Sequence, residues 1–295
     1  MIAAGLIVLF AITYVVLLGL TQLARRMVLG AARRPRAAAS PPVRHACEAV
    51  QRRWPRLYDW LSARMAVGSF AGLPLTLLAV ATFLAAVLLG ELAEDVAEAE
   101  DVVRVDEAVA AFLEPYRTDA LIEVFKWITA LGSGAGVVIA GSVATITLWA
   151  KGWRSSVLPL WVTIQGAQST TWLGKLLFDR ARPEFVAGVV EESAAFPSGH
   201  ATASMAAYGF IAWLIARRMP AWRDRFEVLF WSGVLVLLIG FSRVFLSVHH
   251  LSDVAAGLLV GGVWLLAGVA WLEWREERAT LAPGGVSRTA ESGRQ

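Results

Sequence analysis

Residues 228–272 read VLFWSGVLVLLIGFSRVFLSVHHLSDVAAGLLVGGVWLLAGVAWL. The stretch contains two apolar segments, 228–246 and 251–272, each close to the ~20 residues that a helix needs to cross the hydrocarbon core of a bilayer. A short connection that carries two histidines, His249 and His250, separates them. The stretch therefore predicts two consecutive transmembrane helices with titratable side chains at the point where the chain turns.

Further apolar segments of similar length lie earlier in the chain. They cover residues 2–22, 70–90, 133–150, 156–178 and 200–216. The 295 residues are 57% hydrophobic, with a mean hydropathy of +0.58, more apolar than a soluble domain. The first segment has no basic residues before it, which favours a membrane anchor over a signal peptide. The sequence predicts an all-α, polytopic transmembrane helical bundle of seven spans.

Charge orients the predicted bundle. The loop 25–64 holds ten arginines and two acids, whereas the loop 91–107 holds eight acids and one arginine. The positive-inside rule places the first loop in the cytoplasm and the second outside. We expect a protein of the cell (inner) membrane with three parts. They are an N-terminal span with a basic segment (1–67), a membrane core (68–275) and a disordered cytoplasmic tail (276–295).

Three motifs lie at the ends of predicted spans. They are Lys175-x6-Arg182-Pro183, Pro197-Ser198-Gly199-His200 and Ser242-Arg243-x5-His249-x3-Asp253. Counting spans from the cytoplasmic loop places every one of these ends on the outer face. The motifs therefore predict one site at the outer surface of the membrane.

The first two motifs supply groups that hold an anion. Lys175 and Arg182 are seven residues apart, a spacing that predicts one shared helix face, and Pro183 would end that helix. Ser198 is expected to be the N-cap of the next helix, and Gly199 lets the backbone approach a ligand closely. The free N–H groups of such a helix start attract phosphate.

The third motif supplies a cation and a histidine–carboxylate pair. His249 and Asp253 are four apart, which predicts hydrogen-bond reach along one helix. The carboxylate would keep one imidazole nitrogen protonated and leave the other free to attack. His200 is the candidate to protonate a leaving oxygen, and Arg243 is a further cation for the phosphate. Arg180, in contrast, is interpreted as a residue that snorkels to the interface or packs behind the residues that contact the phosphate.

Together these motifs resemble those of the type 2 phosphatidic acid phosphatase superfamily, which also includes vanadium haloperoxidases and bacterial lipid phosphatases. The resemblance covers roughly residues 120–272. It implies a six-helix phosphatase core, formed by the second to seventh spans, with the first span and the basic loop as additions.

The resemblance also implies roles. His249 would be the nucleophile that forms a phosphohistidine, Asp253 would orient it, and His200 would be the general acid and then the base for water. The implied phosphate-binding residues are Lys175, Arg182, Ser198, Gly199 and Arg243.

The function expected from these features is hydrolysis of a lipid phosphate or diphosphate, without a metal or other cofactor. Fixed cations beside the histidines would repel a divalent ion. Phosphatidic acid, phosphatidylglycerol phosphate, an isoprenyl diphosphate such as undecaprenyl diphosphate and lipid A phosphate all stay open as substrates. The expected partners are a membrane lipid and the bilayer, with no nucleic acid and an open oligomeric state.

Two alternatives remain at this point. A phosphorylated-lipid transporter or flippase would need the cations but not the two histidines and the carboxylate. A vanadate-dependent oxidase of the same superfamily would typically be soluble, unlike this chain. The apolar and acidic loop 184–195 is further expected to guide a lipid chain towards the site.

Overall fold

The structure is a computed structural model that describes most of the predicted core. The described residues are 73–98, 101–183 and 193–281, with short pieces at 14–15, 22, 51–56 and 58–59. The predicted first span and nearly all of the basic loop lie outside the described residues, as do residues 184–192 of the proposed lipid-guiding loop. The account below concerns the compact unit that begins at Leu77.

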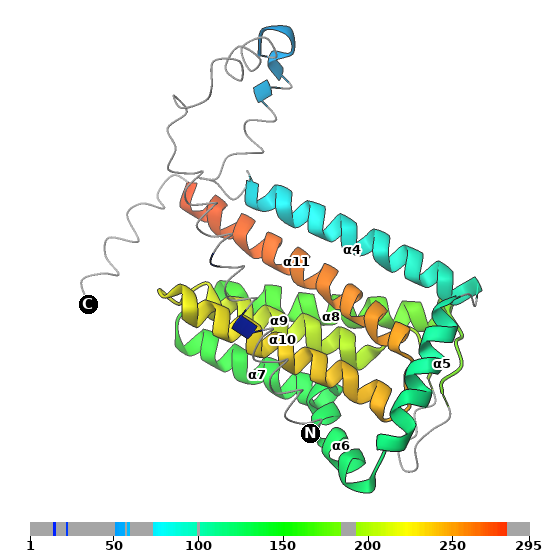
Figure 1. Ribbon diagram of the computed structural model, residues 1–295. Coiled ribbons are helices and arrows are strands. Elements are labelled where there is room, and N and C mark those ends of the chain that lie inside the picture. The colour runs from blue at the N-terminus through cyan, green and yellow to red at the C-terminus, as the bar shows by residue number, and fades with distance from the viewer. Residues whose placement is uncertain are drawn as a thin grey trace. The chain divides into compact units, whose positions relative to one another are not determined.

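Every element in the described ranges is a helix, which confirms the all-α fold. The long helices are α4 (Leu73–Glu98), α5 (Asp101–Leu113), α6 (Asp119–Gly132), α7 (Gly134–Ala150), α8 (Val157–Leu177), α9 (Gly199–Ala216), α10 (Trp222–Phe245) and α11 (Leu251–Leu281). Two short 3-10 turns, Glu114–Tyr116 and Arg154–Ser156, lie between them. The predicted second to seventh spans correspond to α4 and α7 to α11 (Figure 1).

Two helices were not predicted from the sequence. The prediction that residues 91–107 form a loop is wrong, because α4 continues through Glu98 and α5 begins at Asp101. Helix α6 precedes the predicted third span and is bent by 51° against α7. The bend occurs at Ser133, whose hydroxyl accepts a hydrogen bond from the N–H of Gly136 (3.1 Å) and so starts a new helix.

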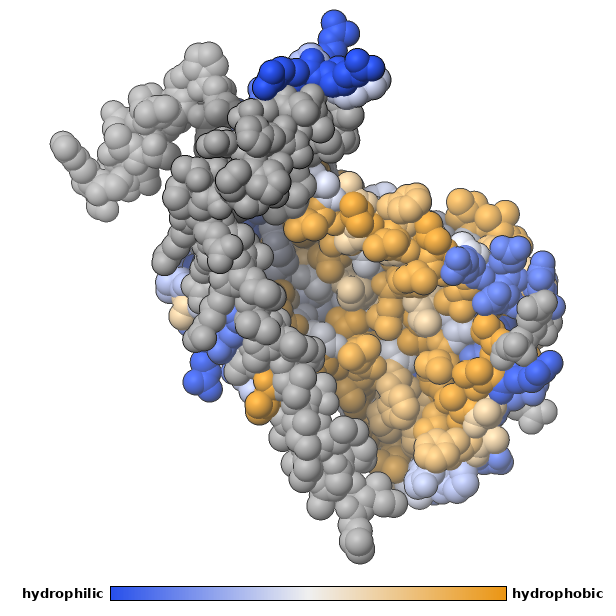
Figure 2. Space-filling view, turned by 45° about the horizontal axis from the view of Figure 1, so that its top comes forward, coloured by the Kyte–Doolittle hydropathy of each residue, from blue (hydrophilic) through white to orange (hydrophobic). Residues whose placement is uncertain are grey.

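Among the described residues, α4, α10 and α11 are long and apolar enough to cross a membrane, and the bent pair α6–α7 is a fourth such segment when it is counted as one span. Large apolar side chains also face outward, such as Phe83 (67% exposed) and Ile146 (69%). Figure 2 shows apolar residues spread over much of the visible side of the bundle. Such a surface is suited to lipid contact, and the chain is an integral membrane protein.

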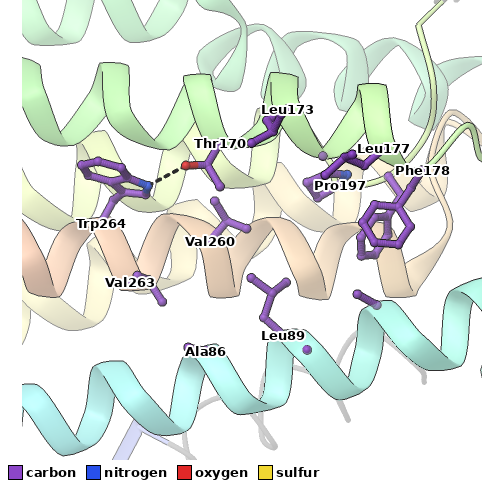
Figure 3. A pocket seen from close by; sticks show the side chains of 14 residues that line it. Ala86, Leu89, Thr170, Leu173, Leu177, Phe178, Pro197, Val260, Val263 and Trp264 are labelled. Atoms are coloured by element: carbon purple, nitrogen blue, oxygen red, sulfur yellow. Dashed lines mark hydrogen bonds between the residues drawn. The ribbon is translucent and has the colours of Figure 1, made fainter.

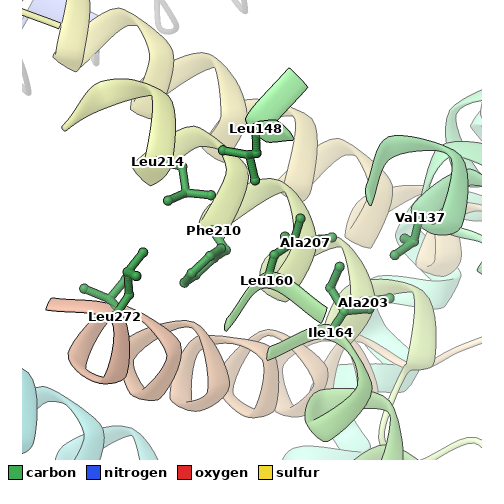
Figure 4. Packing of buried hydrophobic residues seen from close by; sticks show 10 residues of the cluster. Val137, Leu148, Leu160, Ile164, Ala203, Ala207, Phe210, Leu214 and Leu272 are labelled. Carbon is green, nitrogen blue, oxygen red and sulfur yellow. The ribbon is translucent and has the colours of Figure 1, made fainter. Parts of the chain in front are cut away.

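Helix α9 is the centre of the bundle and packs against α7, α8, α10 and α11. Ten of its 18 residues are buried, many of them alanines. Because α9 faces other helices rather than lipid, its composition does not have to be strongly apolar. Around it a core of Leu160, Ile164, Phe210 and their neighbours fills the space between helices (Figure 4).

Two glycines bring α11 unusually close to α9. A Cβ added at Gly257 would lie 2.5 Å from the carbonyl oxygen of Ser198, and one at Gly261 would lie 2.6 Å from that of Thr202. This is the spacing of small residues, four apart, through which membrane helices approach each other closely. The contact places the start of α9 directly against the start of α11.

Candidate active site

Four helix ends meet at one end of the bundle (Figure 1). They are the ends of α8 and α10 and the starts of α9 and α11. The N–H of Ser198 donates to the carbonyl oxygen of Asp253 (2.9 Å), which joins the second motif to the third. A guanidinium hydrogen bond from Arg182 to the carbonyl of Val248 (2.6 Å) joins the first motif to the third. These contacts bring the three motifs together at one end of the bundle, as the sequence predicted.

The turn between α10 and α11 presents His249. It reverses direction at Ser247, which has a left-handed backbone (φ 56°), a common conformation just after a helix end. The N–H groups of Val248 and His249 both donate to the carbonyl of Arg243 (3.2 and 3.3 Å). His249 precedes α11, so the prediction that it shares a helix with Asp253 is wrong. Asp253 instead bends back towards the turn and accepts from the N–H of His250 (2.8 Å).

Contacts on both sides of the imidazole define its tautomer. Nε2 of His249 lies 3.2 Å from Nη1 of Arg182. An arginine can only donate, so Nε2 must accept, and the ring proton belongs on Nδ1. Nδ1 in turn faces Oδ2 of Asp253 at 3.5 Å. The ring therefore offers a lone pair at Nε2, as a nucleophile requires.

Burial keeps this imidazole neutral. Only 2% of His249 is exposed. The pKa of His249 is lowered from 6.5 to about 4, mainly by burial; the charges of Arg182 and Arg243 act in the same direction, and Asp253 opposes them. A neutral ring at physiological pH agrees with a lone pair on Nε2.

A buried network behind Asp253 was missed by the sequence analysis. Oδ1 of Asp253 accepts from Nη1 of Arg180 (2.5 Å), and Nη2 of Arg180 donates to Oδ2 of Asp106 (2.9 Å). Asp106 also accepts from the N–H and the hydroxyl of Ser252 (2.9 and 2.5 Å). Arg180 is therefore not a snorkelling side chain, because it bridges two carboxylates. The acidic character of residues 91–107 gave no signal that one of them, Asp106, would be 3% exposed.

The first motif reaches the site differently from its prediction. Helix α8 ends at Leu177, and Phe178 adopts an extended backbone, so Lys175 and Arg182 do not share a helix face. The carbonyl of Arg180 accepts from the N–H of Ala195 (2.9 Å), which holds this segment extended. The extended chain is what allows Arg180 to reach the two carboxylates.

Lys175 and Arg182 converge on one short segment even so. Lys175 donates to the hydroxyl of Ser193 (2.9 Å) and the carbonyl of Ala194 (2.7 Å). Arg182 donates to the carbonyl of Ser193 (2.7 Å) and to its hydroxyl (3.1 Å). Lys175 and Arg182, of which Arg182 also contacts the His249 ring, thus direct their donors at the same oxygen atoms. Phosphate oxygens could take the place of these acceptors.

The second motif opens α9 as predicted, with Ser198 at the N-cap position. Its hydroxyl makes no capping bond. It is fully buried, and none of the described residues offers it a hydrogen-bond partner. A Cβ at Gly199 would meet only Thr171, at 3.7 Å, so the helix start is open to a ligand. A buried, unpaired hydroxyl beside free helix N–H groups suits an anion.

His200 and Arg243 complete the set. His200 lies half-buried in the first turn of α9, and the last residue of α6, Gly132, packs against it. Arg243 is 2% exposed and donates to the hydroxyl of Thr129 on α6 (2.9 Å). Helix α6, absent from the sequence prediction, therefore supports both residues.

A neutral imidazole held against cations, at one end of an all-helical membrane bundle, is what a membrane phosphatase requires. The sequence model of the PAP2 superfamily matches residues 130–277, and the chain belongs to that superfamily.

The chain is also similar to individual proteins of known name or structure. Phosphatidylglycerophosphatase B of Bacillus subtilis (strain 168) is 32% identical over 164 residues, which are 53% of this chain and 77% of that protein. The crystal structure of a transmembrane PAP2-type phosphatidylglycerolphosphate phosphatase from Bacillus subtilis superimposes with a TM-score of 0.58 and 27% identity, covering 64% of this chain and 94% of that one. The crystal structure of Aquifex aeolicus LpxE gives a TM-score of 0.43 and 21% identity, covering 55% and 93%.

Proposed function

We propose that this membrane phosphatase hydrolyses a lipid phosphate through a covalent phosphohistidine on His249. The observation that carries the proposal is the state of the His249 ring. Its Nε2 faces a donor-only guanidinium at 3.2 Å, and its Nδ1 faces Asp253. A nucleophile needs an unprotonated nitrogen beside an anion-binding group, and Nε2 of His249, which accepts from Arg182, is such a nitrogen.

The first half-reaction forms the phosphoenzyme. The phosphate displaces the oxygens of Ser193 and Ala194 from Lys175 and Arg182, and Nε2 of His249 attacks phosphorus. The N–P bond forms as the ester P–O bond breaks, and His200 gives its proton to the leaving alkoxide. The fixed cations neutralise the charge that grows on the phosphoryl oxygens, a task for which other phosphatases use a divalent metal.

The second half-reaction releases phosphate. His200, now neutral, takes a proton from water, whose oxygen attacks phosphorus as the N–P bond breaks. The imidazole of His249 leaves in its original tautomer, because Asp253 still holds the Nδ1 proton. Arg243 and the N–H groups at the start of α9 hold the phosphate until it departs.

The substrate proposed first is phosphatidylglycerol phosphate, because relatives that match this chain carry that activity in their names. Phosphatidic acid, an isoprenyl diphosphate and lipid A phosphate share the same terminal phosphoryl group and form the comparison panel. Phosphate release from each would be measured on purified protein in EDTA. A protein that binds these lipids without releasing phosphate would instead be a transporter.

Quenching in alkaline SDS, in which the N–P bond of a phosphohistidine survives, with substrate radiolabelled in its phosphate tests the intermediate. Wild type should show label on protein, and His249→Ala should show none. His200→Ala with a good leaving group should accumulate label, because the phosphoenzyme forms but water is not activated. Labelling of His249→Ala at the wild-type level would overturn the covalent role of this residue.

We also propose that the site faces the outer side of the inner membrane, on the strength of the charge distribution in the loops. Asp119 lies at the start of α6 and Lys151 just beyond the end of α7, both exposed. In a Cys47→Ala background, Asp119→Cys should react with an impermeant thiol reagent in intact cells. Lys151→Cys should react only after lysis, and the opposite pattern would reverse the orientation.

A further inference from the structure

An apolar cavity of about 350 Å³ lies between α4, α8 and α11 (Figure 3). Its walls are almost entirely hydrocarbon, contributed by residues such as Leu89 on α4, Leu173 on α8 and Val260 on α11. Its size is that of a small-molecule site. The cavity plays no part in the chemistry described above.

Helix α4 leaves this space open because it contacts the bundle near its two ends. Near the active site, Val96 packs with Phe196 and Ala256. Towards the other end, Leu78 packs against the main core. The middle of α4 lines the cavity through Ala86 and its neighbours. The cavity is therefore bounded on one side by a helix that is otherwise exposed to lipid.

One end of the cavity adjoins the phosphate site. Pro197 and Gly174 line it there, and they are the immediate chain neighbours of Ser198 and Lys175. A Cβ at Gly174 would lie 2.6 Å from Cδ of Pro197, so the two segments are in direct contact. A molecule with its phosphate at the site has an adjacent apolar space for its tail.

Trp264 defines the other end. Its indole N–H donates to the hydroxyl of Thr170 (3.0 Å), as Figure 3 shows. Its ring lies against the backbone of Gly166, where a Cβ would come within 2.3 Å of the ring. Trp264 follows Asp253 by eleven residues on α11, about 16 Å of helix. Half of a bilayer core is about 15 Å, so Trp264 lies roughly one leaflet below Asp253.

We propose that this cavity binds one acyl chain of the lipid substrate, and that Trp264 is the floor that sets the preferred chain length. The proposal rests on the function proposed above. Continuity with the phosphate site, through Pro197 and Gly174, favours the substrate over a bulk phospholipid as the occupant. The depth of Trp264, roughly one leaflet below Asp253, fits the floor of a site for a chain that descends from a phosphate at the membrane surface.

Chain-length profiles test the proposal. The substrates are phosphatidic acids with paired octanoyl, palmitoyl or arachidoyl chains, with p-nitrophenyl phosphate as a chain-free ester. Trp264→Ala should shift the preference in kcat/KM towards arachidoyl chains. Each methylene group that becomes buried in the enlarged cavity should raise kcat/KM about fourfold. Hydrolysis of p-nitrophenyl phosphate should stay at the wild-type rate.

Three further variants distinguish a role of Trp264 as the floor of the cavity from a general role in packing. Trp264→Phe keeps an aromatic floor and should keep the wild-type profile. Gly166→Ala pushes the Trp264 ring towards the cavity and should selectively slow the long chains. Trp231→Ala is the matched control, because Trp231 on α10 is 52% exposed, lies outside the cavity and donates its indole N–H to Glu227. It should leave the profile unchanged.

The outcomes are distinguishable. If Trp264→Ala changes all chain lengths by the same factor, the cavity holds a bulk lipid or only supports the fold, and the inference is refuted. If wild type hydrolyses p-nitrophenyl phosphate but prefers no chain length, the inference again fails while the proposed phosphatase chemistry stands. If wild type releases phosphate from none of the substrates, the proposed function fails.

Discussion

The contact between α9 and α11 at Gly257 gives the sharpest mutational test. In Gly257→Ala the new Cβ would lie 2.5 Å from the carbonyl oxygen of Ser198, about 1 Å short of the 3.4 Å at which ordinary contact begins. A backbone oxygen cannot rotate away, and this one also accepts from the N–H and the hydroxyl of Thr202 (both 3.0 Å). The start of α9, with His200, must move relative to Asp253.

A shift of about 1 Å in a reacting group costs on the order of 100-fold in rate. We therefore expect Gly257→Ala to lower kcat by about that factor, while overpacking lowers the free energy of unfolding by about 1–3 kcal/mol. The assay is phosphate release from purified protein, beside thermal unfolding in the same detergent.

Gly262→Ala is the matched control for this variant. Its Cβ would meet only the Cε of Met205, at 3.7 Å, which is ordinary contact. It should change the free energy of unfolding by less than about 0.5 kcal/mol and leave kcat near that of wild type. A folded Gly257→Ala protein with wild-type kcat would refute the claim that this contact places His200.

Three other outcomes follow from the site. Asp106→Asn removes an oxygen that accepts from Arg180 and Ser252. This change should lower the free energy of unfolding by about 3 kcal/mol. It should also reduce kcat by a larger factor than it raises KM. The control Glu107→Gln, at the exposed neighbouring position, should change neither the free energy of unfolding nor kcat. If the two variants had equal effects, the proposed role of the Asp106–Arg180 contact would be contradicted. Neutral His249 is the proposed nucleophile, and its pKa is lowered to about 4. Protonation of this ring should therefore reduce kcat/KM as pH falls through about 4, and a loss centred near 6.5 would contradict the assignment. Phosphate release should persist in EDTA and be inhibited by vanadate, which mimics the five-coordinate transition state; loss in EDTA that Mg²⁺ restores would contradict the metal-free mechanism.

The predicted spans and the common location of the motifs depended on properties that are local in sequence. Apolar length marks a helix that crosses the membrane, and alternation of direction then decides which helix ends meet. The placement of Ser198 at a helix start could be read from the residues around it for the same reason. These features required no knowledge of which side chains touch.

What the sequence did not predict depends on contacts between distant residues. Asp106 and Arg180 are 74 positions apart, and nothing in an acidic segment distinguishes the one carboxylate that becomes buried. The extended path from Leu177 to Arg182 replaces the expected helix, because it lets Arg180 reach Asp106 and Asp253. The sequence analysis did not predict helix α6, because its charged residues interrupt the apolar pattern that precedes α7.

Helix α5 has a consequence for how the enzyme responds to its surroundings. It runs across the end of the bundle (Figure 1), and beside the buried Asp106 it exposes Val105 (53%) and Phe112 (67%). A helix with outward apolar and acidic residues is suited to the headgroup layer. Headgroups in contact with α5 would act through Asp106 on Arg180, and through Arg180 on Asp253 beside the proposed nucleophile. We therefore expect the thickness and the surface charge of the bilayer to change the catalytic rate through α5, even when no additional lipid enters the site.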